Sequence, residues 1–135
     1  MERKKRALPF ALIAGLAAIG VGAYLLLRKV IATIQSISYV LTVSPGEVFT
    51  VSVNWTAGES FTGNLVFYCW NWSKTYIAIA GGNPITTFSP GTRSDSMMAT
   101  VDPLTPTGSY LVNIQVRKDS TVVAEGWGTS PVVVF

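Results

Sequence analysis

The sequence contains no histidine and a single cysteine, Cys69, among its 135 residues. Histidine is the commonest general base and the commonest metal ligand, so its absence removes most catalytic and metal-binding templates. One thiol excludes an intramolecular disulfide and any metal centre that needs several thiolates. No carboxylates are grouped with a nucleophile, and we therefore expect no catalytic residues, no metal, no cofactor and no small-molecule substrate: the chain is not expected to be an enzyme.

Charged residues are also scarce, at 13% of the chain against about 25% in an average soluble domain. The hydrophobic fraction is 49% and the mean hydropathy is +0.41, so part of the chain is expected in a non-aqueous environment. Six of the ten basic residues lie within the first 29 positions, and the remainder carries four basic and six acidic residues. A mildly acidic domain does not attract a phosphate backbone, so nucleic acid is not an expected partner.

The N-terminal part contains the longest apolar run. Residues 7–27 include no charged side chain, and an α-helix of that length covers about 31 Å, the thickness of a bilayer core. We predict a single transmembrane helix over residues 7–29, because the run is longer than the about 7–15 apolar residues of a signal peptide. By the positive-inside rule we expect residues 1–6 to lie inside and the C-terminal domain outside, at a cell surface or virion membrane. The basic flanking residues are Arg3, Lys4, Lys5, Arg6, Arg28 and Lys29.

Small residues recur at four-residue spacing within this segment, at Ala14, Ala18 and Gly22. Small residues at that spacing let two helix backbones approach closely, which indicates helix packing in an oligomer. Alanine and glycine are also common in membrane helices without any such role, and both interpretations stay open.

Polar and apolar residues alternate from about Thr33 onward, which predicts a β-domain over residues 33–135. Turn residues separate short strands, and seven or eight of these predict an all-β, immunoglobulin-like antiparallel β-sandwich preceded by the one transmembrane helix. The segment 104–114 resembles the tyrosine corner of such folds, in which a residue placed like Tyr110 bonds back to the preceding loop. After a first strand within residues 33–43, the predicted strands cover residues 48–55, 64–72, 75–80, 96–101, 109–116, 121–126 and 131–135.

Aromatic residues cluster in and after the strand predicted at 64–72. Because side chains alternate in a strand, Tyr68, Trp70 and Trp72 share one face, opposite Phe67 and Cys69. The favoured interpretation is that one of the two sets fills the core, so that only the other can reach a surface. An aromatic platform for sugars and a contact between subunits are the alternatives for that set, since aromatic side chains often anchor protein interfaces.

Two Asn-X-Ser/Thr triplets begin at Asn54 and Asn71. Such triplets are candidate N-glycan acceptors on a domain that faces outward, although they also arise often by chance. They agree with the predicted orientation of the domain.

The stretch Lys5-Arg6-Ala7-Leu8-Pro9-Phe10, followed by an apolar helix and a sandwich, resembles archaeal type IV pilin and archaellin precursors. That resemblance implies cleavage between Arg6 and Ala7 and a filament subunit. Arg28 and Lys29 depart from the pattern, because they interrupt the helix at the membrane boundary.

The same layout of basic N-terminus, membrane span and compact sandwich also resembles small membrane-anchored structural proteins of viruses with an internal membrane. We therefore expect a non-enzymatic assembly protein, anchored in a bilayer and packed against its own copies or a surrounding capsid or envelope protein. A minor capsid or cell-envelope role is the first expectation. A pilin-like filament subunit and an anchored binding or adhesion module are the alternatives.

Overall fold

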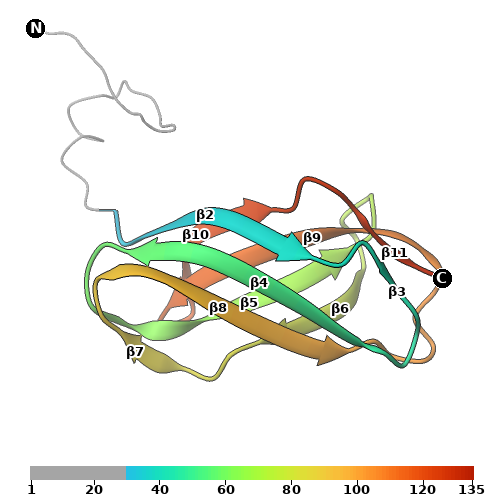
Figure 1. The fold of residues 1–135 in the computed structure, drawn as a ribbon, viewed down its shortest axis with the longest axis horizontal. Helices are drawn as coiled ribbons and strands as arrows, with labels where there is room; N and C mark the ends of the chain where they lie inside the picture. The colour runs from blue at the N-terminus through green and yellow to red at the C-terminus, as the bar shows by residue number, and fades with distance from the viewer. Residues whose placement is uncertain (1–29) are drawn as a thin grey trace, which may run out of the picture. The chain divides into compact units, whose positions relative to one another are not determined.

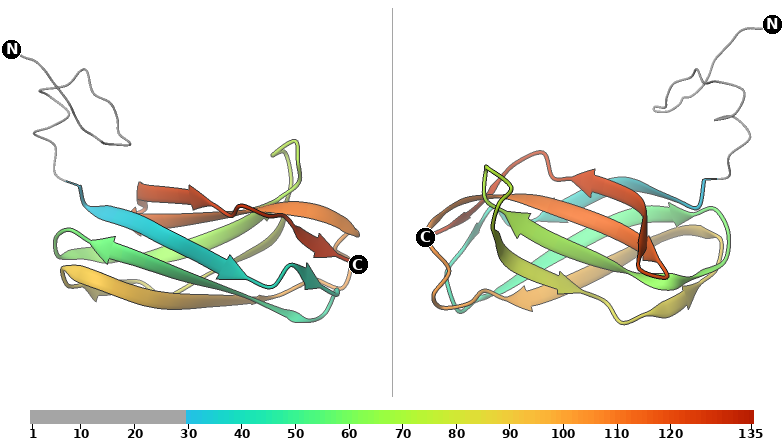
Figure 2. Two further views of the ribbon diagram at one scale, coloured as in Figure 1. Left: turned by 45° about the horizontal axis from the view of Figure 1, so that its top comes forward. Right: turned by 180° about the vertical axis from the view of Figure 1, so that it is seen from behind.

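The computed structural model describes residues 30–135, which form two β-sheets packed face to face (Figures 1 and 2). The predicted all-β sandwich is confirmed for this range. Its strands are β2 (Ala32–Tyr39), β3 (Thr42–Val43), β4 (Val48–Ala57), β5 (Phe61–Trp70), β6 (Ile77–Gly82), β7 (Thr86–Phe88), β8 (Gly91–Thr100), β9 (Gly108–Lys118), β10 (Thr121–Trp127) and β11 (Val132–Val134).

The smaller sheet has the order β2-β4-β8 and is antiparallel throughout. The larger sheet has the order β3-β11-β9-β5-β6, with β10 also paired to β9 and β7 also paired to β5. Its pairs are antiparallel except for β3 and β11, which run parallel. The antiparallel sandwich predicted from the sequence therefore contains one parallel pair, at the C-terminal strand.

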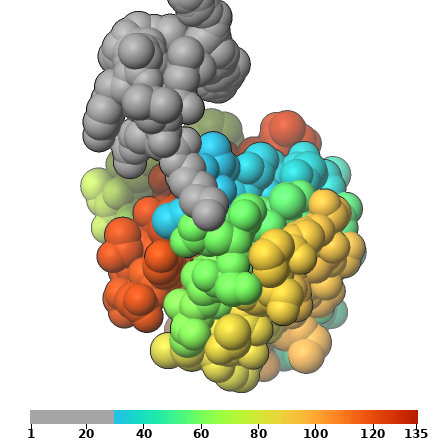
Figure 3. Space-filling view, turned by 90° about the vertical axis from the view of Figure 1, so that its left-hand side faces the viewer, coloured from blue at the N-terminus to red at the C-terminus, as the bar shows by residue number. Residues whose placement is uncertain are grey.

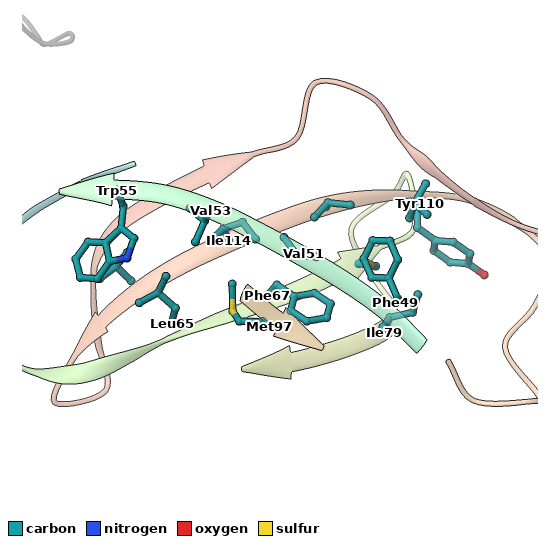
Figure 4. Packing of buried hydrophobic residues seen from close by; sticks show 14 of the residues in the cluster. Phe49, Val51, Val53, Trp55, Leu65, Phe67, Ile79, Met97, Tyr110 and Ile114 are labelled. Atoms are coloured by element: carbon teal, nitrogen blue, oxygen red, sulfur yellow. The ribbon is translucent and has the colours of Figure 1, made fainter. Parts of the chain in front are cut away.

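The core forms because the central strands alternate between buried and exposed positions along their length. Every second residue of β4 from Phe49 to Ala57 is buried, and so is every second residue of β5 from Phe61 to Cys69. The inward side chains of the two sheets interdigitate (Figure 4). Full burial of one large apolar side chain stabilises a fold by about 1.5–3 kcal/mol, so this alternation fixes which face of each strand looks inward.

The tyrosine corner predicted at Tyr110 is present. Its ring is 4% exposed, and its hydroxyl donates a 2.6 Å hydrogen bond to the carbonyl oxygen of Pro106, in the loop before β9. The donor lies in β9 and the acceptor lies in the loop before it, so this bond fixes the loop against the start of the strand.

The sandwich has two distinct ends (Figure 1). We call the end where β2 begins the proximal end. Antiparallel pairing places the last residue of β2, the first residue of β4 and the last residue of β8 at the opposite end, which we call the distal end. The turns at residues 44–47, 71–76 and 101–107 also lie at the distal end, together with the C-terminus.

The membrane segment predicted over residues 7–29 lies outside the described residues. Within residues 30–135 no helix is long and apolar enough to cross a membrane.

Candidate functional site

The outer face of the smaller sheet is lined with short, uncharged polar side chains that bond to one another. The hydroxyls of Ser52 and Ser96 lie 3.0 Å apart, across β4 and β8. The amide of Asn54 donates to Ser36 at 2.8 Å, and its oxygen accepts a hydrogen bond from Ser94. These groups satisfy one another, so the middle of this face offers few unpaired polar groups, and the large apolar side chains exposed on the same face are Val48 and Met98.

The outer face of the larger sheet is aromatic instead. Tyr68 and Trp70 of β5 are partly exposed there, with ring centroids 6.3 Å apart, whereas Phe67 and Cys69 point into the core. The structure therefore places Tyr68 and Trp70 on one face, as the alternation predicted. Trp127 of β10 is 40% exposed and pairs with Asn113 of β9, the strand that joins β10 to β5.

A polar network of β9 and β10 side chains lies beside these aromatic residues and includes the Tyr68 hydroxyl. The guanidinium of Arg117 donates to the Tyr68 hydroxyl at 3.0 Å and to the Gln115 amide oxygen at 2.8 Å. The amide of Asn113, which is 1% exposed, donates to the Glu125 carboxylate at 2.9 Å. Charge-assisted hydrogen bonds of this kind are the stronger ones, so the surface is ordered before any partner arrives.

The turn between β5 and β6 displays further aromatic side chains. The Asn71 side-chain oxygen accepts hydrogen bonds from the backbone N–H groups of Thr75 and Tyr76, at 2.9 and 3.0 Å. Lys74 adopts a left-handed backbone conformation (φ 58°), and its ammonium lies 4.6 Å from the centre of the Trp127 ring. The Asn71 side chain thus closes the turn. Trp72 lies in the same turn, and 61% of its surface is exposed.

Exposed apolar side chains are concentrated at the distal end. Leu104 is 89% exposed, although Asp102 fixes its backbone by accepting a 2.7 Å hydrogen bond from the Leu104 N–H. Single exposed apolar residues are normal on soluble proteins, whereas a group of them at one end is a candidate interaction surface. The distal apolar residues are Val40, Leu41, Val48, Trp72, Tyr76, Leu104 and Phe135.

A cleft of about 230 Å³ opens between β2 and β10, on one long side of the sandwich. Ile34 and Ile37 of β2 line one side, and Glu125 and Trp127 of β10 line the other, with Thr129 just beyond. Figure 3 looks at the proximal end and shows β2 (blue) between β4 (green) and the hairpin of β9 and β10 (orange-red).

Two carboxylates of the described residues take part in local contacts. Asp95 accepts a 2.7 Å hydrogen bond from the Trp55 indole and lies 3.4 Å from Arg93, while Glu59 lies 3.3 Å from Lys118. Within residues 30–135 no group of three or more Cys, Asp or Glu side chains is arranged to hold a metal ion. Burial raises the pKa of the Cys69 thiol to about 12, which keeps it in the unreactive protonated form.

The predicted site residues fall into three groups in the structure. Tyr68, Trp70 and Trp72 lie on the aromatic face and on the turn that follows it. Asn54 and Asn71 are accessible or partly accessible, and their amides are engaged in the hydrogen bonds described above, so glycosylation stays a prediction. The remaining predicted residues lie outside the described range: Arg3, Lys4, Lys5, Arg6, Ala14, Ala18, Gly22, Arg28 and Lys29.

The sequence analysis missed Trp127, Lys74, Leu104 and the Asn113 network. Trp127 comes directly after the predicted strand at residues 121–126. Its neighbours on the outer face of the larger sheet belong to other strands, such as Asn113 of β9. Only the alternation of β10, continued by one residue, would have pointed to it.

No protein-family model matches this sequence, and no curated protein matches it. Among solved structures, a Niemann-Pick type C2 protein from Japanese carpenter ant superposes with a TM-score of 0.53 at 9% identity, covering 81% of this chain and 96% of that one. A Pseudomonas fluorescens alkylpurine DNA glycosylase, bound to DNA with an abasic site analogue, gives 0.53 at 9% identity over 77% of this chain and 30% of that one. At such low identity these likenesses show a shared fold alone.

Proposed function

We propose that this chain is a non-enzymatic, single-pass membrane protein whose sandwich lies outside the membrane and joins an assembly. The partners are the lipid bilayer, through residues 7–29, and copies of the chain or a surrounding capsid or envelope protein. A virion or cell-envelope component fits this arrangement. We also propose an immunoglobulin-like topology for the sandwich, which the hydrogen bond from Tyr110 to Pro106 supports.

The observation that carries the proposal is the concentration of exposed apolar side chains at the distal end. Leu104 and Trp72 are 89% and 61% exposed on turns whose backbones are fixed by Asp102 and Asn71. A rigid turn loses little conformational entropy on binding, and an exposed tryptophan or leucine is favourable to bury in a partner.

The anchor and the assembly surface are tested separately. We expect the full-length protein to remain in the membrane fraction after alkaline carbonate extraction, with residues 30–135 open to added protease from the outer side. Release by carbonate would contradict the anchor whatever the sandwich binds.

For the assembly surface, the variant Leu104→Ser/Trp72→Ser should reduce the yield of the native complex, on a blue native gel, by on the order of tenfold. Both side chains are exposed, so the isolated fold should keep its stability. Val122→Ser is the matched control, because Val122 is 43% exposed but lies beside the β9–β10 turn at the proximal end. Equal yields from the two variants would refute a distal interface.

A further inference from the structure

The strand β8 has a long and regular free edge. Within the described residues β8 pairs with β4 alone, and Figure 1 shows it as the outermost strand of the smaller sheet. Its ten residues, Gly91–Thr100, pair with β4 without a register shift. An edge of this kind is a template for pairing with a strand of another chain.

The other edge strands of the sandwich are short or irregular. The strands β3 and β7 have two and three residues. The pairings of β2, β6 and β10 each contain a register shift. Short length and bulges both hinder edge-to-edge pairing, so β8 is the edge strand of the described sandwich that has neither protection.

The direction of the backbone groups of β8 follows from the residue after it. The N–H of Val101 donates to the carbonyl oxygen of Glu47 at 2.8 Å, and its own carbonyl oxygen accepts from the N–H of Gly46 at 2.7 Å. Both groups of Val101 therefore point toward the β4 side. Because this direction alternates along a strand, the odd-numbered residues of β8 bond to β4 and the even-numbered residues face the free edge.

Part of that edge is covered and part is open. A Cβ placed on Gly81 of β6 would lie 2.9 Å from the Met98 carbonyl oxygen, so β6 covers the edge at that point. Thr92, Ser94 and Ser96 are exposed and lie nearer the proximal end. Their N–H and C=O groups are thus the ones available to a second strand.

We propose that two copies of this chain pair through their β8 edges, antiparallel and about a two-fold axis at Ser94. Each Ser94 exchanges its two backbone hydrogen bonds with Ser94 of the second copy, and Thr92 does the same with Ser96 of that copy. The two three-stranded sheets then form one continuous sheet.

Charge selects this register. Arg93 and Asp95 point toward the core side of β8, since Arg93 lies 4.9 Å from the centre of the Phe88 ring and Asp95 bonds to the Trp55 indole. An axis at Ser94 places Arg93 of each copy opposite Asp95 of the other, in a pair without mutual backbone hydrogen bonds, where side chains come closest. An axis at Arg93 or at Asp95 would place like charges opposite one another. Inward charges usually keep an edge unpaired, and here they exclude other registers and other strands.

The two charged groups keep capacity for this contact. The side chains of Arg93 and Asp95 are 36% and 23% exposed. The contacts that Asp95 makes with Trp55 and with Arg93 both end on Oδ2, at 2.7 and 3.4 Å, which leaves Oδ1 for the second copy.

The proposal goes beyond the assembly role, because it requires neither the anchor nor the distal surface. Its test is the mass of the full-length protein in detergent, measured by light scattering over a range of concentrations. We expect a dimer whose dissociation constant rises on the order of tenfold or more in Arg93→Glu and in Asp95→Lys, because each change places like charges opposite one another. A 1:1 mixture of the two variants should restore the dimer, since each changed side chain then faces an opposite charge.

Lys118→Glu is the matched control. Lys118 is 37% exposed in a 3.3 Å ion pair with Glu59, much as Arg93 is placed beside Asp95, but it lies on β9. This variant should dimerise like the wild type. A monomeric wild-type protein, a dimer that Arg93→Glu leaves intact, or a mixture of folded variants that stays monomeric would overturn the proposal.

Ser94→Pro tests the pairing without a change of charge, and it stays decisive if Asp95→Lys does not fold. It removes an N–H that faces the free edge, so the fold should persist, as checked by circular dichroism, while the dimer is lost. Ser94→Ala keeps the N–H and should keep the dimer. Equal dimerisation of the two variants would contradict the β8 pairing. The Leu104→Ser/Trp72→Ser variant should still dimerise, so failure of this proposal is distinguishable from failure of the distal interface.

Discussion

Tyr110 shows how one hydroxyl group stabilises a loop. Its ring is buried and its hydroxyl donates to the Pro106 carbonyl, so Tyr110→Phe leaves that carbonyl without its partner. We expect the free energy of unfolding to fall by about 1–3 kcal/mol, measured by urea denaturation. Tyr76→Phe is the control, since Tyr76 is 46% exposed. Equal losses in the two variants would mean that the corner bond contributes nothing.

Cys69 predicts how stability depends on alkaline pH. Burial raises its pKa to about 12 in the folded chain, whereas the exposed thiol of the unfolded chain has the ordinary pKa of 9.0. Between these values the folded state binds more protons, so the free energy of unfolding falls as the pH rises, by up to about 1.4 kcal/mol per pH unit from this group. Below pH 9 this contribution is fully present.

Denaturation of Cys69→Ala at several pH values measures that slope. The variant should lose stability less steeply above pH 9, because alanine has no proton to lose. Tyr39 and Tyr110, whose pKa values burial also raises, are the same in both proteins and cancel in the comparison. An unchanged slope would show that the thiol is not protected from ionising.

Sequence alone placed Tyr68 and Trp70 on a common face because strand alternation is a local rule. It did not place Trp127 beside them, because that neighbourhood depends on the pairing of β10 with β9. Asn71 was predicted as a glycan acceptor from its triplet. Its role in closing the turn was hidden, since that role depends on the backbone conformation at residues 71–76.

At the scale of single elements, β11 is the clearest test of how the sandwich closes. This strand lies between β3 and β9, and Val132 and Val134 are buried in the core. Deletion of residues 132–135 removes both side chains and breaks two strand pairings, a loss of at least several kcal/mol against a total stability of about 5–15 kcal/mol. We expect the shortened chain not to fold, as measured by circular dichroism and protease resistance.

Phe135→Ser is the control for that deletion. The Phe135 side chain is 65% exposed, so its loss should leave folding unchanged while removing part of the distal apolar surface. A folded deletion variant would contradict the role given to β11.

The long strands could be predicted because β4 and β5 keep a strict two-residue period of burial, and β9 departs from it only at Asn113, which is buried between Val112 and Ile114. The first predicted strand, within residues 33–43, is two strands in the structure: exposed Val40 and Leu41 carry the chain from β2 in one sheet to β3 in the other. Such a crossing keeps the alternating pattern, so the sequence does not reveal it. The strand β7 is only three residues long, too short for any period to appear.

At the scale of the whole sandwich, the two outer faces and the two ends differ in chemistry. The smaller sheet presents hydroxyl groups that satisfy one another, and the larger sheet presents aromatic rings beside a polar network that includes the Tyr68 hydroxyl. The distal end adds exposed apolar residues on fixed turns. Monomeric proteins rarely expose large apolar patches, and the grouping of apolar residues at the distal end is the basis for the proposed assembly role.

The most direct test is photo-crosslinking of the full-length protein in its native membrane or particle fraction, with a photoreactive amino acid at position 72, 104 or 52. Residues 72 and 104 lie at the distal end, and Ser52 lies on the hydroxyl-lined face. We expect adducts to a second copy or to a shell protein from positions 72 and 104, and few from position 52. Adducts from position 52 alone, or none from the distal positions, would contradict assembly through the distal end.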